Sequence, residues 1–314
     1  MNQKHILLFS LLIIATSCAT YAPQYKVKND ITAFPTDKEI ANQFYLIGDA
    51  GYSPIGGMSP GLTAAKAVIK IENSADDFAI YLGDNIYPDG MPIKGDEERK
   101  YAENHLNGQL MAVNDFEGTT YFIPGNHDWY NNGLFGLARE QSYLIEQSGN
   151  AEIFQPMNGC PLKSVSVSED VQIIIIDSQW YLEDWDSDPN FNFNCDIKSR
   201  EKFFIEIDLE IRKNRNKIIV FAMHHPMFTN GTHGGYFGLN KHLYPLQEKI
   251  PMPLLASLVT QIRTQGGISV QDRYNELYNK LMNRLGDIAR KHPRLVFASG
   301  HEHSLHHIEK DGLI

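Results

Sequence analysis

The sequence of 314 residues is poor in cysteine, lacks any stretch rich in Lys and Arg, and has no internal repeats or low-complexity tracts. Its 28 Lys and Arg residues are outnumbered by 38 Asp and Glu residues, so the formal net charge is −10 at pH 7. Without a basic stripe, we expect no binding to the phosphate backbone of a nucleic acid. After the N-terminal leader there is no apolar run long enough to predict a transmembrane helix.

The leader contains the one extended apolar run. Lys4 precedes apolar residues from Ile6 to Ala15, a run that is too short to cross a bilayer and is typical of a secretory signal. Small residues then lead to Cys18, a pattern that resembles a bacterial lipoprotein signal, in which the cysteine carries the lipid. We therefore expect a signal peptide over 1–18, a polar tether over 19–42, and a lipid anchor at Cys18. The anchor would hold the protein at the membrane of the bacterial cell envelope, in the periplasm or at the cell surface. An ordinary signal peptide is the alternative.

Only two cysteines remain if Cys18 is lipidated, namely Cys160 and Cys195. An oxidising envelope permits a disulfide between them, which would join two loops across a long intervening segment. Two separate thiols are the alternative that the sequence leaves open.

The rest of the chain alternates apolar strand candidates with helical patterns. Its length of about 270 residues suits one large domain with a sizeable core, which we place at 43–314. The alternation predicts an α/β architecture with helices outside the sheets. The expected strands are 44–47, 78–82, 119–123, 164–167, 171–176, 217–223 and 295–298, and the expected helices are 61–71, 97–111, 198–212 and 271–291.

Two long stretches lack a regular pattern, and the sequence stops inside an expected hairpin. Irregular segments as long as 180–194 and 229–253 usually have a function, so we expect both of them to line the active-site cleft. Surface insertions exposed to solvent are the alternative. Near the end, the pattern predicts a strand at 304–308, a turn at 310–312 and the start of a second strand at 313–314. This unfinished hairpin indicates a fragment of a longer polypeptide, which could carry a further C-terminal domain.

Five short motifs rich in metal-ligand side chains each follow an apolar, β-prone run. Because the carboxyl ends of neighbouring strands meet at one edge of a sheet, we expect these side chains to converge. The motifs are Gly48-Asp49-Ala50-Gly51, Gly83-Asp84-Asn85-Ile86-Tyr87, Gly125-Asn126-His127-Asp128, Met223-His224-His225-Pro226 and Gly300-His301-Glu302-His303.

The chemistry of the donors assigns them to two metal ions. Asp84 is the expected bridge, because one carboxylate can bind two hard cations with its two oxygens. Tyr87 lies three residues further on, and its phenolate requires a strongly Lewis-acidic ion such as Fe³⁺. His301 and His303 project to the same side of an extended chain, which allows one imidazole for each ion. We predict one site of Asp49, Asp84, Tyr87 and His303, and a second site of Asp84, Asn126, His224 and His301.

Such a pair of ions predicts hydrolysis of a small phosphorylated substrate. Two ions about 3.5–4 Å apart clamp a phosphoryl group and lower the pKa of a water molecule, so that hydroxide is available for in-line attack. His127 follows Asn126 directly and is placed to stabilise the phosphoryl group or to protonate the leaving alkoxide.

The five motifs resemble those of the calcineurin-like metallophosphoesterase superfamily, and specifically its purple acid phosphatase branch. The superfamily usually has Asp-x-His in its first motif, whereas this chain has Asp49-Ala50-Gly51 and carries Tyr87 in the second motif. That paired change is typical of the purple-type branch, whose small mammalian-type members are most similar. The resemblance extends over residues 44–307.

The resemblance implies a fold, an activity and one further residue. The implied fold is a four-layer α/β/β/α sandwich, with two mixed sheets flanked by helices. The implied activity is hydrolysis of phosphate monoesters at iron paired with iron, zinc or manganese. The family also places a second substrate-contacting histidine at the position of His233, nine residues after His224.

Two alternatives to a phosphomonoesterase remain open. The same metals would serve a phosphodiesterase or a nucleotide pyrophosphatase. A non-catalytic module of a larger envelope protein could also retain the fold, although the complete set of ligands disfavours it.

Overall fold

The computed structural model describes residues 40–71, 73–185, 194–245, 250–265 and 269–314. This part of the chain divides into two compact units. The first, which we call the sandwich unit, comprises residues 40–227 and 280–314. The second, the inserted unit, comprises residues 228–279. The expected leader at 1–18 and most of the tether at 19–42 lie outside the described residues. Within the described residues, no helix combines the length and the apolar character needed to span a membrane.

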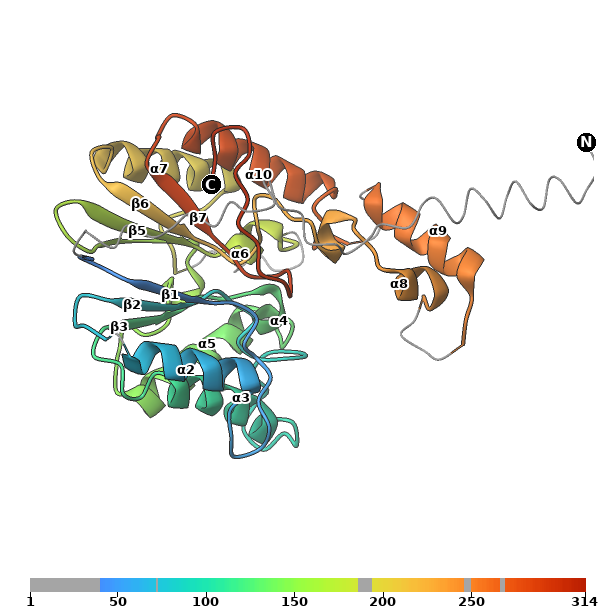
Figure 1. The fold of residues 1–314 in the computed structure, drawn as a ribbon, viewed down its shortest axis with the longest axis horizontal. Helices are drawn as coiled ribbons and strands as arrows, with labels where there is room; N and C mark the ends of the chain where they lie inside the picture. Colours follow the sequence, from blue (N-terminus) through green and yellow to red (C-terminus); the bar gives the residue numbers. More distant parts are fainter. Residues whose placement is uncertain (1–39, 72, 186–193, 246–249, 266–268) are drawn as a thin grey trace, which may run out of the picture. The chain divides into compact units, whose positions relative to one another are not determined.

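The first sheet of the sandwich unit is parallel. It contains β1 (Phe44–Ile47), β2 (Phe78–Tyr81) and β3 (Thr119–Phe122) in sequential order. The helices α2 (Pro60–Ile71) and α3 (Arg99–Ala112) connect these strands, and α5 (Leu134–Ser148) follows them. Parallel neighbours need such a crossover, because a short turn cannot return the chain to the same end of the sheet. All three helices lie on the outer side of this sheet (Figure 1).

The second sheet is mixed and has the order β4-β5-β6-β7. Its strands are β4 (Leu162–Ser166), β5 (Val171–Ile176), β6 (Ile218–Ala222) and β7 (Leu295–Ala298). The tight connection between β4 and β5 makes that pair antiparallel, whereas the other two pairs are parallel. On its outer side lie α7 (Arg200–Lys213) and α10 (Glu276–Ala289), of which residues 280–289 belong to the sandwich unit (Figure 1). The predicted sandwich is confirmed; among the described strands only this second sheet is mixed.

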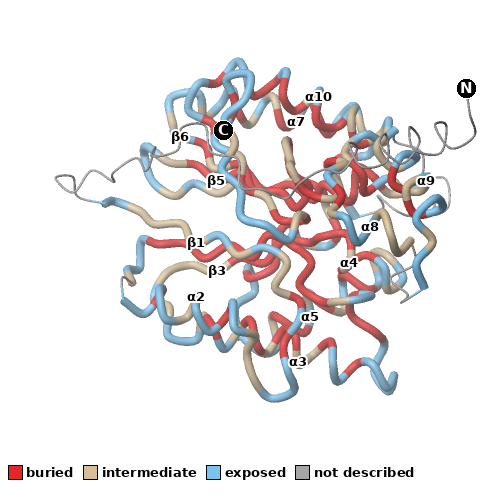
Figure 2. The backbone as a smooth tube through the Cα atoms, turned by 45° about the vertical axis from the view of Figure 1, so that its right-hand side comes forward, coloured by how far each residue is buried: buried red, intermediate tan, exposed pale blue. Residues whose placement is uncertain are grey.

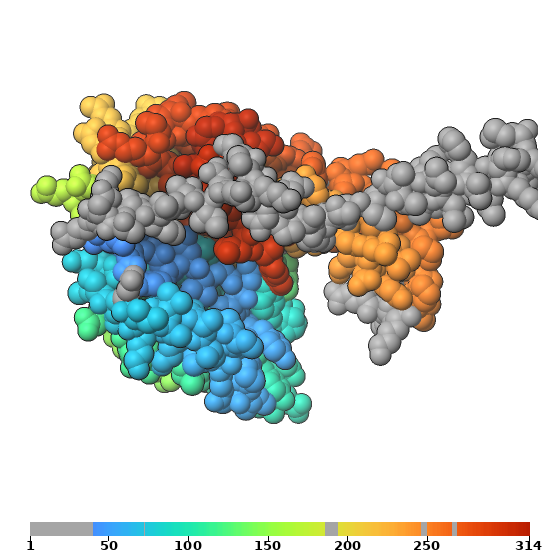
Figure 3. All heavy atoms as spheres, in the orientation of Figure 1, coloured from blue at the N-terminus to red at the C-terminus, as the bar shows by residue number. Residues whose placement is uncertain are grey.

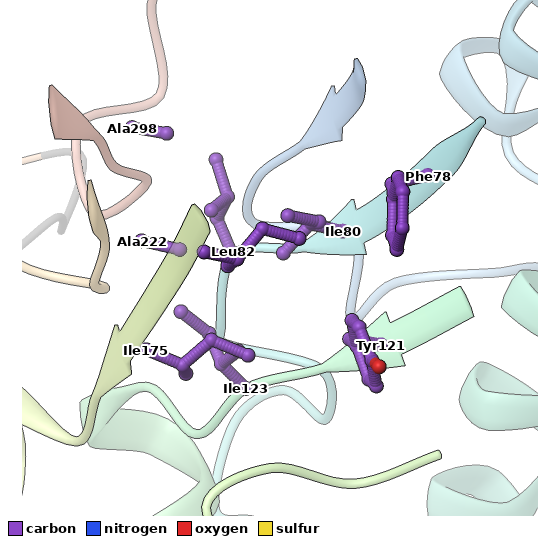
Figure 4. Packing of buried hydrophobic residues seen from close by; sticks show 9 residues of the cluster. Phe78, Ile80, Leu82, Tyr121, Ile123, Ile175, Ala222 and Ala298 are labelled. Atoms are coloured by element: carbon purple, nitrogen blue, oxygen red, sulfur yellow. The ribbon is translucent and has the colours of Figure 1, made fainter. Parts of the chain in front are cut away.

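The core of the sandwich unit lies between the two sheets. Apolar side chains from β2 and β3 meet those from β5 and from the ends of β6 and β7 (Figure 4). Figure 2 shows the burial that results, with buried strands in the centre and exposed helix faces outside. The cluster consists of Phe78, Ile80, Leu82, Tyr121, Ile123, Ile173, Ile175, Ala222 and Ala298. Because the ligand motifs begin where these strands end, the packed core fixes their positions.

A disulfide joins Cys160 and Cys195, which confirms the pairing that the sequence left open. Cys160 follows a short 3₁₀ turn, η1 (Met157–Gly159), just before β4. Cys195 lies before α7, after the gap at 186–193. The bond therefore ties the start of the second sheet to the segment that leads into its covering helix.

Several sequence predictions were wrong in their bounds or type. The helix expected at 271–291 begins at Glu276, because Asn275 caps its start by accepting a hydrogen bond from the Leu277 amide at 3.0 Å. The strand expected at 304–308 has no regular structure, since Ser304 to His307 are all exposed and no apolar face holds them to a sheet. The expected turn does form: Lys310 and Leu313 pair across it, and Ile314 accepts a hydrogen bond from the Phe297 amide at 2.8 Å.

The inserted unit contains little regular structure apart from its helices. These are η2 (Thr232–Gly234), α8 (Leu239–Leu243), α9 (Pro253–Thr264) and the first turn of α10, residues 276–279. The helix α9 was not predicted from the sequence, although Leu254, Leu258 and Ile262 recur at helical spacing; all three are exposed in the structure. The expectation that 229–253 walls the cleft stays a prediction.

The fold predicts a large loss of stability when the inter-sheet core is truncated. Ile175 is fully buried in the cluster, so Ile175→Ala should lower the free energy of unfolding by about 2–5 kcal/mol. Urea denaturation measures this change. Val68→Ala on α2 is the matched control, because Val68 is 57% exposed, and it should cost no more than about 0.5 kcal/mol. Equal losses for the two variants would contradict the assignment of the core.

Candidate metal centre

The five ligand motifs lie at the carboxyl ends of five strands of the sandwich unit. They follow β1, β2 and β3 in the first sheet, and β6 and β7 in the second. Segments far apart in the sequence meet here, since the His301 amide donates a hydrogen bond to Asp49 Oδ1 at 3.0 Å. Figure 3 shows a related proximity on its visible face, where the red segment near the C-terminus adjoins the blue segment that begins at residue 40. The predicted convergence is therefore present.

One group of donors is buried around His224. Its Nε2 lies 3.0 Å from Asn126 Oδ1, 3.2 Å from His301 Nδ1 and 3.3 Å from Asp84 Oδ1. Asn126 Oδ1 is also 3.1 Å from His301 Nδ1. Tetrahedral donors about 2.0–2.2 Å from a common ion are separated by about 3.3–3.6 Å, which is close to this spacing. The four predicted ligands of the second site are thus gathered around one point.

A second group of donors surrounds the phenol oxygen of Tyr87. This oxygen lies 3.0 Å from Asp84 Oδ2, 3.0 Å from His303 Nε2 and 3.2 Å from Asp49 Oδ1. A phenol has one hydrogen and can donate it to only one of these three neighbours. The four predicted ligands of the first site are therefore also together.

Asp84 belongs to both groups through different oxygens. Its Oδ1 faces His224, and its Oδ2 faces Tyr87. The Asp84 carboxylate is buried, at 2% exposure, so solvent does not screen it. This arrangement is the one that the sequence predicts for a carboxylate shared by two cations.

The hydrogen bonds of the side chains aim lone pairs into the centre. His224 Nδ1 lies 2.8 Å from the Leu82 carbonyl, which can only accept, so Nδ1 carries a hydrogen and Nε2 is the nitrogen left to bind a metal ion. Asn126 Nδ2 donates to the Tyr130 hydroxyl at 2.7 Å, which turns Oδ1 toward His224 and His301. Lone pairs facing one another at about 3 Å repel unless a cation lies between them. The donor set therefore fits bound metal ions.

In the protein without metal, the pKa shifts of the buried side chains also indicate that this site favours positive charge. Burial would lower the pKa of His224, but the carboxylates of Asp84 and Asp49 outweigh it and raise the pKa to about 9. Burial would raise the pKa of Asp84, but the neighbouring His224 and His127 outweigh this effect and hold the pKa below its ordinary range. For Tyr87, burial and the two carboxylates all raise the pKa of the phenol. A phenolate here requires a strongly Lewis-acidic partner.

Comparison with known proteins agrees with this geometry. The family model described as calcineurin-like phosphoesterase matches residues 43–305. The chain belongs to the calcineurin-like phosphoesterase family.

The chain is also similar to three curated plant proteins. It is 25% identical to purple acid phosphatase 7 of Arabidopsis thaliana over 213 residues, which cover 66% of this chain and 60% of the relative. It is 25% identical to purple acid phosphatase 17 of the same plant over 224 residues, covering 68% and 60%. Identity to purple acid phosphatase 3 is 22% over 244 residues, covering 76% and 61%. The matches thus span about 60% of the length of these relatives. The family predicted from the motifs is confirmed.

Three of the predicted metal-binding residues have a backbone conformation that L-residues rarely adopt. Asp49, Asp84 and His301 have φ values of 56°, 54° and 72°. Such left-handed residues cost free energy and are retained where the surrounding structure enforces them. Each lies two or three residues after the end of a strand, so the abrupt turn directs its side chain to the rim. Sequence patterns do not reveal this strain.

Two glycines are needed because the ligand loops approach one another closely. A Cβ at Gly125 would lie 2.2 Å from the Asp84 amide nitrogen and 2.3 Å from Asp84 Oδ1. At Gly83, where φ is +89°, a Cβ would lie 2.6 Å from His224 Nδ1. These contacts are too short for any side chain, which explains the glycines that precede Asn126 and Asp84.

Buried polar groups hold the second and third motifs together. The Asp128 carboxylate accepts hydrogen bonds from the backbone amides of Gly125, Asn85 and Ile86 at 2.7–3.0 Å. The Asn85 side chain also donates to Glu140 on α5 at 3.1 Å. Asp128 thus orients its neighbours, whereas Glu140 lies outside every motif and was not predicted.

The predicted catalytic His127 lies at the edge of the centre. Its backbone amide donates to Asp84 Oδ1 at 2.9 Å, and its Nε2 is 4.0 Å from Asp84 Oδ2. Its Nδ1 lies 2.5 Å from the Pro88 carbonyl, so Nδ1 carries a hydrogen and Nε2 is the nitrogen that faces the metal ligands. The side chain is 29% exposed and is therefore accessible to a substrate.

The other predicted histidine, His233, belongs to the inserted unit. Its Nδ1 lies 3.0 Å from Asp272 Oδ1, and the Arg263 guanidinium binds both oxygens of the same carboxylate. Burial would raise the pKa of Asp272, but Arg263 and His233 outweigh it and lower the pKa. Asp272 thus holds the His233 ring in one orientation, which the sequence did not predict. The role of His233 toward the substrate stays a prediction.

A buried carboxyl beside the third motif gives the phosphoesterase a predicted pH dependence of stability. Asp177 caps α6 (Ser178–Leu182) and accepts a hydrogen bond from Trp129 Nε1 at 3.0 Å. Burial raises its pKa from 3.8 to about 7, so between these values the native state holds a proton that the unfolded state has lost. This group should therefore make stability fall as the pH rises from about 4 to about 7.

Urea denaturation of the metal-free protein at several pH values tests this dependence. Relative to Asp177→Asn, the wild type should lose stability progressively between pH 4 and pH 7 and then level off. Parallel curves for the two proteins would contradict the assignment of this proton to Asp177.

Proposed function

We propose that the protein is a binuclear-metal phosphoesterase that hydrolyses phosphate monoesters in the manner of an acid phosphatase. The observation that carries the proposal is the division of the Asp84 oxygens between two groups of donors. The named relatives support the same chemistry, although they are 22–25% identical. We further propose that the substrate is a small phosphorylated molecule. We also propose that the protein acts at the cell envelope, where a lipid on Cys18 anchors it to the membrane.

The metal ions and the side chains around them would have separate roles in this reaction. When bound, two metal ions would supply Lewis acidity and lower the pKa of a water molecule, so that hydroxide is available to attack phosphorus. His127, with its Nδ1–H held by the Pro88 carbonyl, would need a second hydrogen on Nε2, and this Nε2–H would hydrogen-bond the phosphoryl group or protonate the leaving oxygen. The buried faces of Asp84, Asn126 and His224 exclude solvent from one side of the centre.

The donor chemistry supports iron in one of the two sites. Tyr87 is surrounded by two carboxylates and His303, and these carboxylates oppose ionisation of the phenol. Among the metals that such donors bind, Fe³⁺ is acidic enough to stabilise a phenolate. Iron, zinc or manganese is proposed for the site of Asn126, His224 and His301.

Substitution of single ligands tests the proposed activity. Asp84→Ala and His301→Ala should each lower the turnover of a chromogenic phosphomonoester by at least about a thousandfold, because each removes part of the metal centre. The matched control is His307→Ala, since His307 is exposed and takes no part in either donor group. Activity in either ligand variant comparable to the wild type would sink the proposal. The same assay is run with a phosphodiester and a nucleotide pyrophosphate. Faster hydrolysis of either one than of the monoester would indicate the corresponding alternative activity.

A spectroscopic measurement tests the assignment of Tyr87. Loaded with iron, the wild type should show a visible phenolate-to-iron charge-transfer band that is lost in Tyr87→Phe. Metal content should be measured on both proteins, so that loss of colour is not mistaken for loss of iron. A band of the same intensity in the variant would show that Tyr87 does not bind the ion.

A further inference from the structure

Tyr130 lies beside the metal centre but outside the five ligand motifs. It follows α4 (Asn126–Trp129) directly, four residues after Asn126, which places both residues on the same side of the helical turn. Its hydroxyl accepts a hydrogen bond from Asn126 Nδ2 at 2.7 Å. Its ring meets the His127 ring edge-on, with centroids 4.8 Å apart.

The position of Tyr130 is fixed by its neighbours. The adjacent Trp129 is buried and donates its indole hydrogen to Asp177 at 3.0 Å, which anchors the helical turn. The Tyr130 amide in turn donates to the His127 carbonyl at 3.2 Å. Tyr130 itself is 46% exposed, so a rigid backbone presents a solvent-accessible phenol next to the ligands.

The direction of the hydrogen bond leaves the hydroxyl hydrogen available. An amide NH₂ group can only donate, so Asn126 uses a lone pair of the phenol oxygen and not its hydrogen. The oxygens of a phosphoryl group are acceptors only. A substrate phosphoryl group bound next to Asn126 Oδ1 would therefore find a donor in Tyr130, on the same side as His127.

We propose that Tyr130 contacts the substrate, donating its hydroxyl hydrogen to a phosphoryl oxygen while it holds the amide of Asn126. This inference rests on the proposed function, because it requires a phosphoryl group at the metal centre. Tyr130 and His127 then hydrogen-bond the same phosphoryl group from neighbouring positions of one helical turn. The contact makes recognition of phosphate depend on a residue outside the metal ligands.

Binding of inorganic phosphate tests the proposal without relying on turnover. The full-length protein, its Tyr130→Phe variant and the control Tyr101→Phe are loaded with iron and zinc, and their metal content per chain is measured. Tyr101 is a partly exposed tyrosine of α3, away from the ligand motifs. Calorimetry should show phosphate binding about 5–10 times weaker in Tyr130→Phe, the loss expected for one hydrogen bond, and unchanged in Tyr101→Phe.

The outcomes separate this inference from the proposed function. Equal phosphate affinity in Tyr130→Phe and wild type overturns the contact and leaves the phosphoesterase assignment intact. Loss of metal from Tyr130→Phe at the concentrations that saturate the wild type also overturns it, because Tyr130 would then serve only to orient Asn126. A metal-loaded wild type that neither binds phosphate nor hydrolyses an ester refutes both.

Discussion

The shared carboxylate of Asp84 is the constraint on which the rest of the site depends. One oxygen faces the buried group around His224 and the other faces the more exposed group around Tyr87. A displacement of either oxygen would separate the two groups. The His127 amide at 2.9 Å holds the first oxygen, and Gly125 lies so close to Asp84 that any side chain at position 125 would collide with it. The local chain is therefore built around this one side chain.

The fold supplies this geometry at a cost in local stability. Left-handed conformations at Asp49, Asp84 and His301 are unfavourable, and the converging lone pairs and buried carboxylates repel one another in the absence of cations. The large core between the sheets offsets these terms, since Ile80, Ile173 and Ile175 are fully buried there. Metal binding would remove the repulsion between the lone pairs and the buried carboxylates. Stability and function are thus coupled through the same strand ends.

Much of the sandwich and of the ligand set could be predicted from the sequence. The strand β2 is continuously apolar and β5 is apolar apart from Gln172, so their positions are clear, and the five motifs follow strands in a recognisable order. The helix α5 was missed because its buried face includes Glu140, which interrupts the apolar periodicity. Asp272 and Tyr130 were missed for another reason: their roles come from spatial proximity to His233 and Asn126, and neither lies in a motif. The strain at the ligands is likewise a property of the folded backbone.

The central claim is that two cations share Asp84, and anomalous diffraction from crystals of the iron- and zinc-loaded protein tests it most directly. The account predicts two anomalous peaks about 3.5–4 Å apart, with the Asp84 carboxylate between them. Tyr87 should lie beside the iron, and Asn126 should lie beside the other ion. A single peak, or two peaks that do not both contact Asp84, would contradict it.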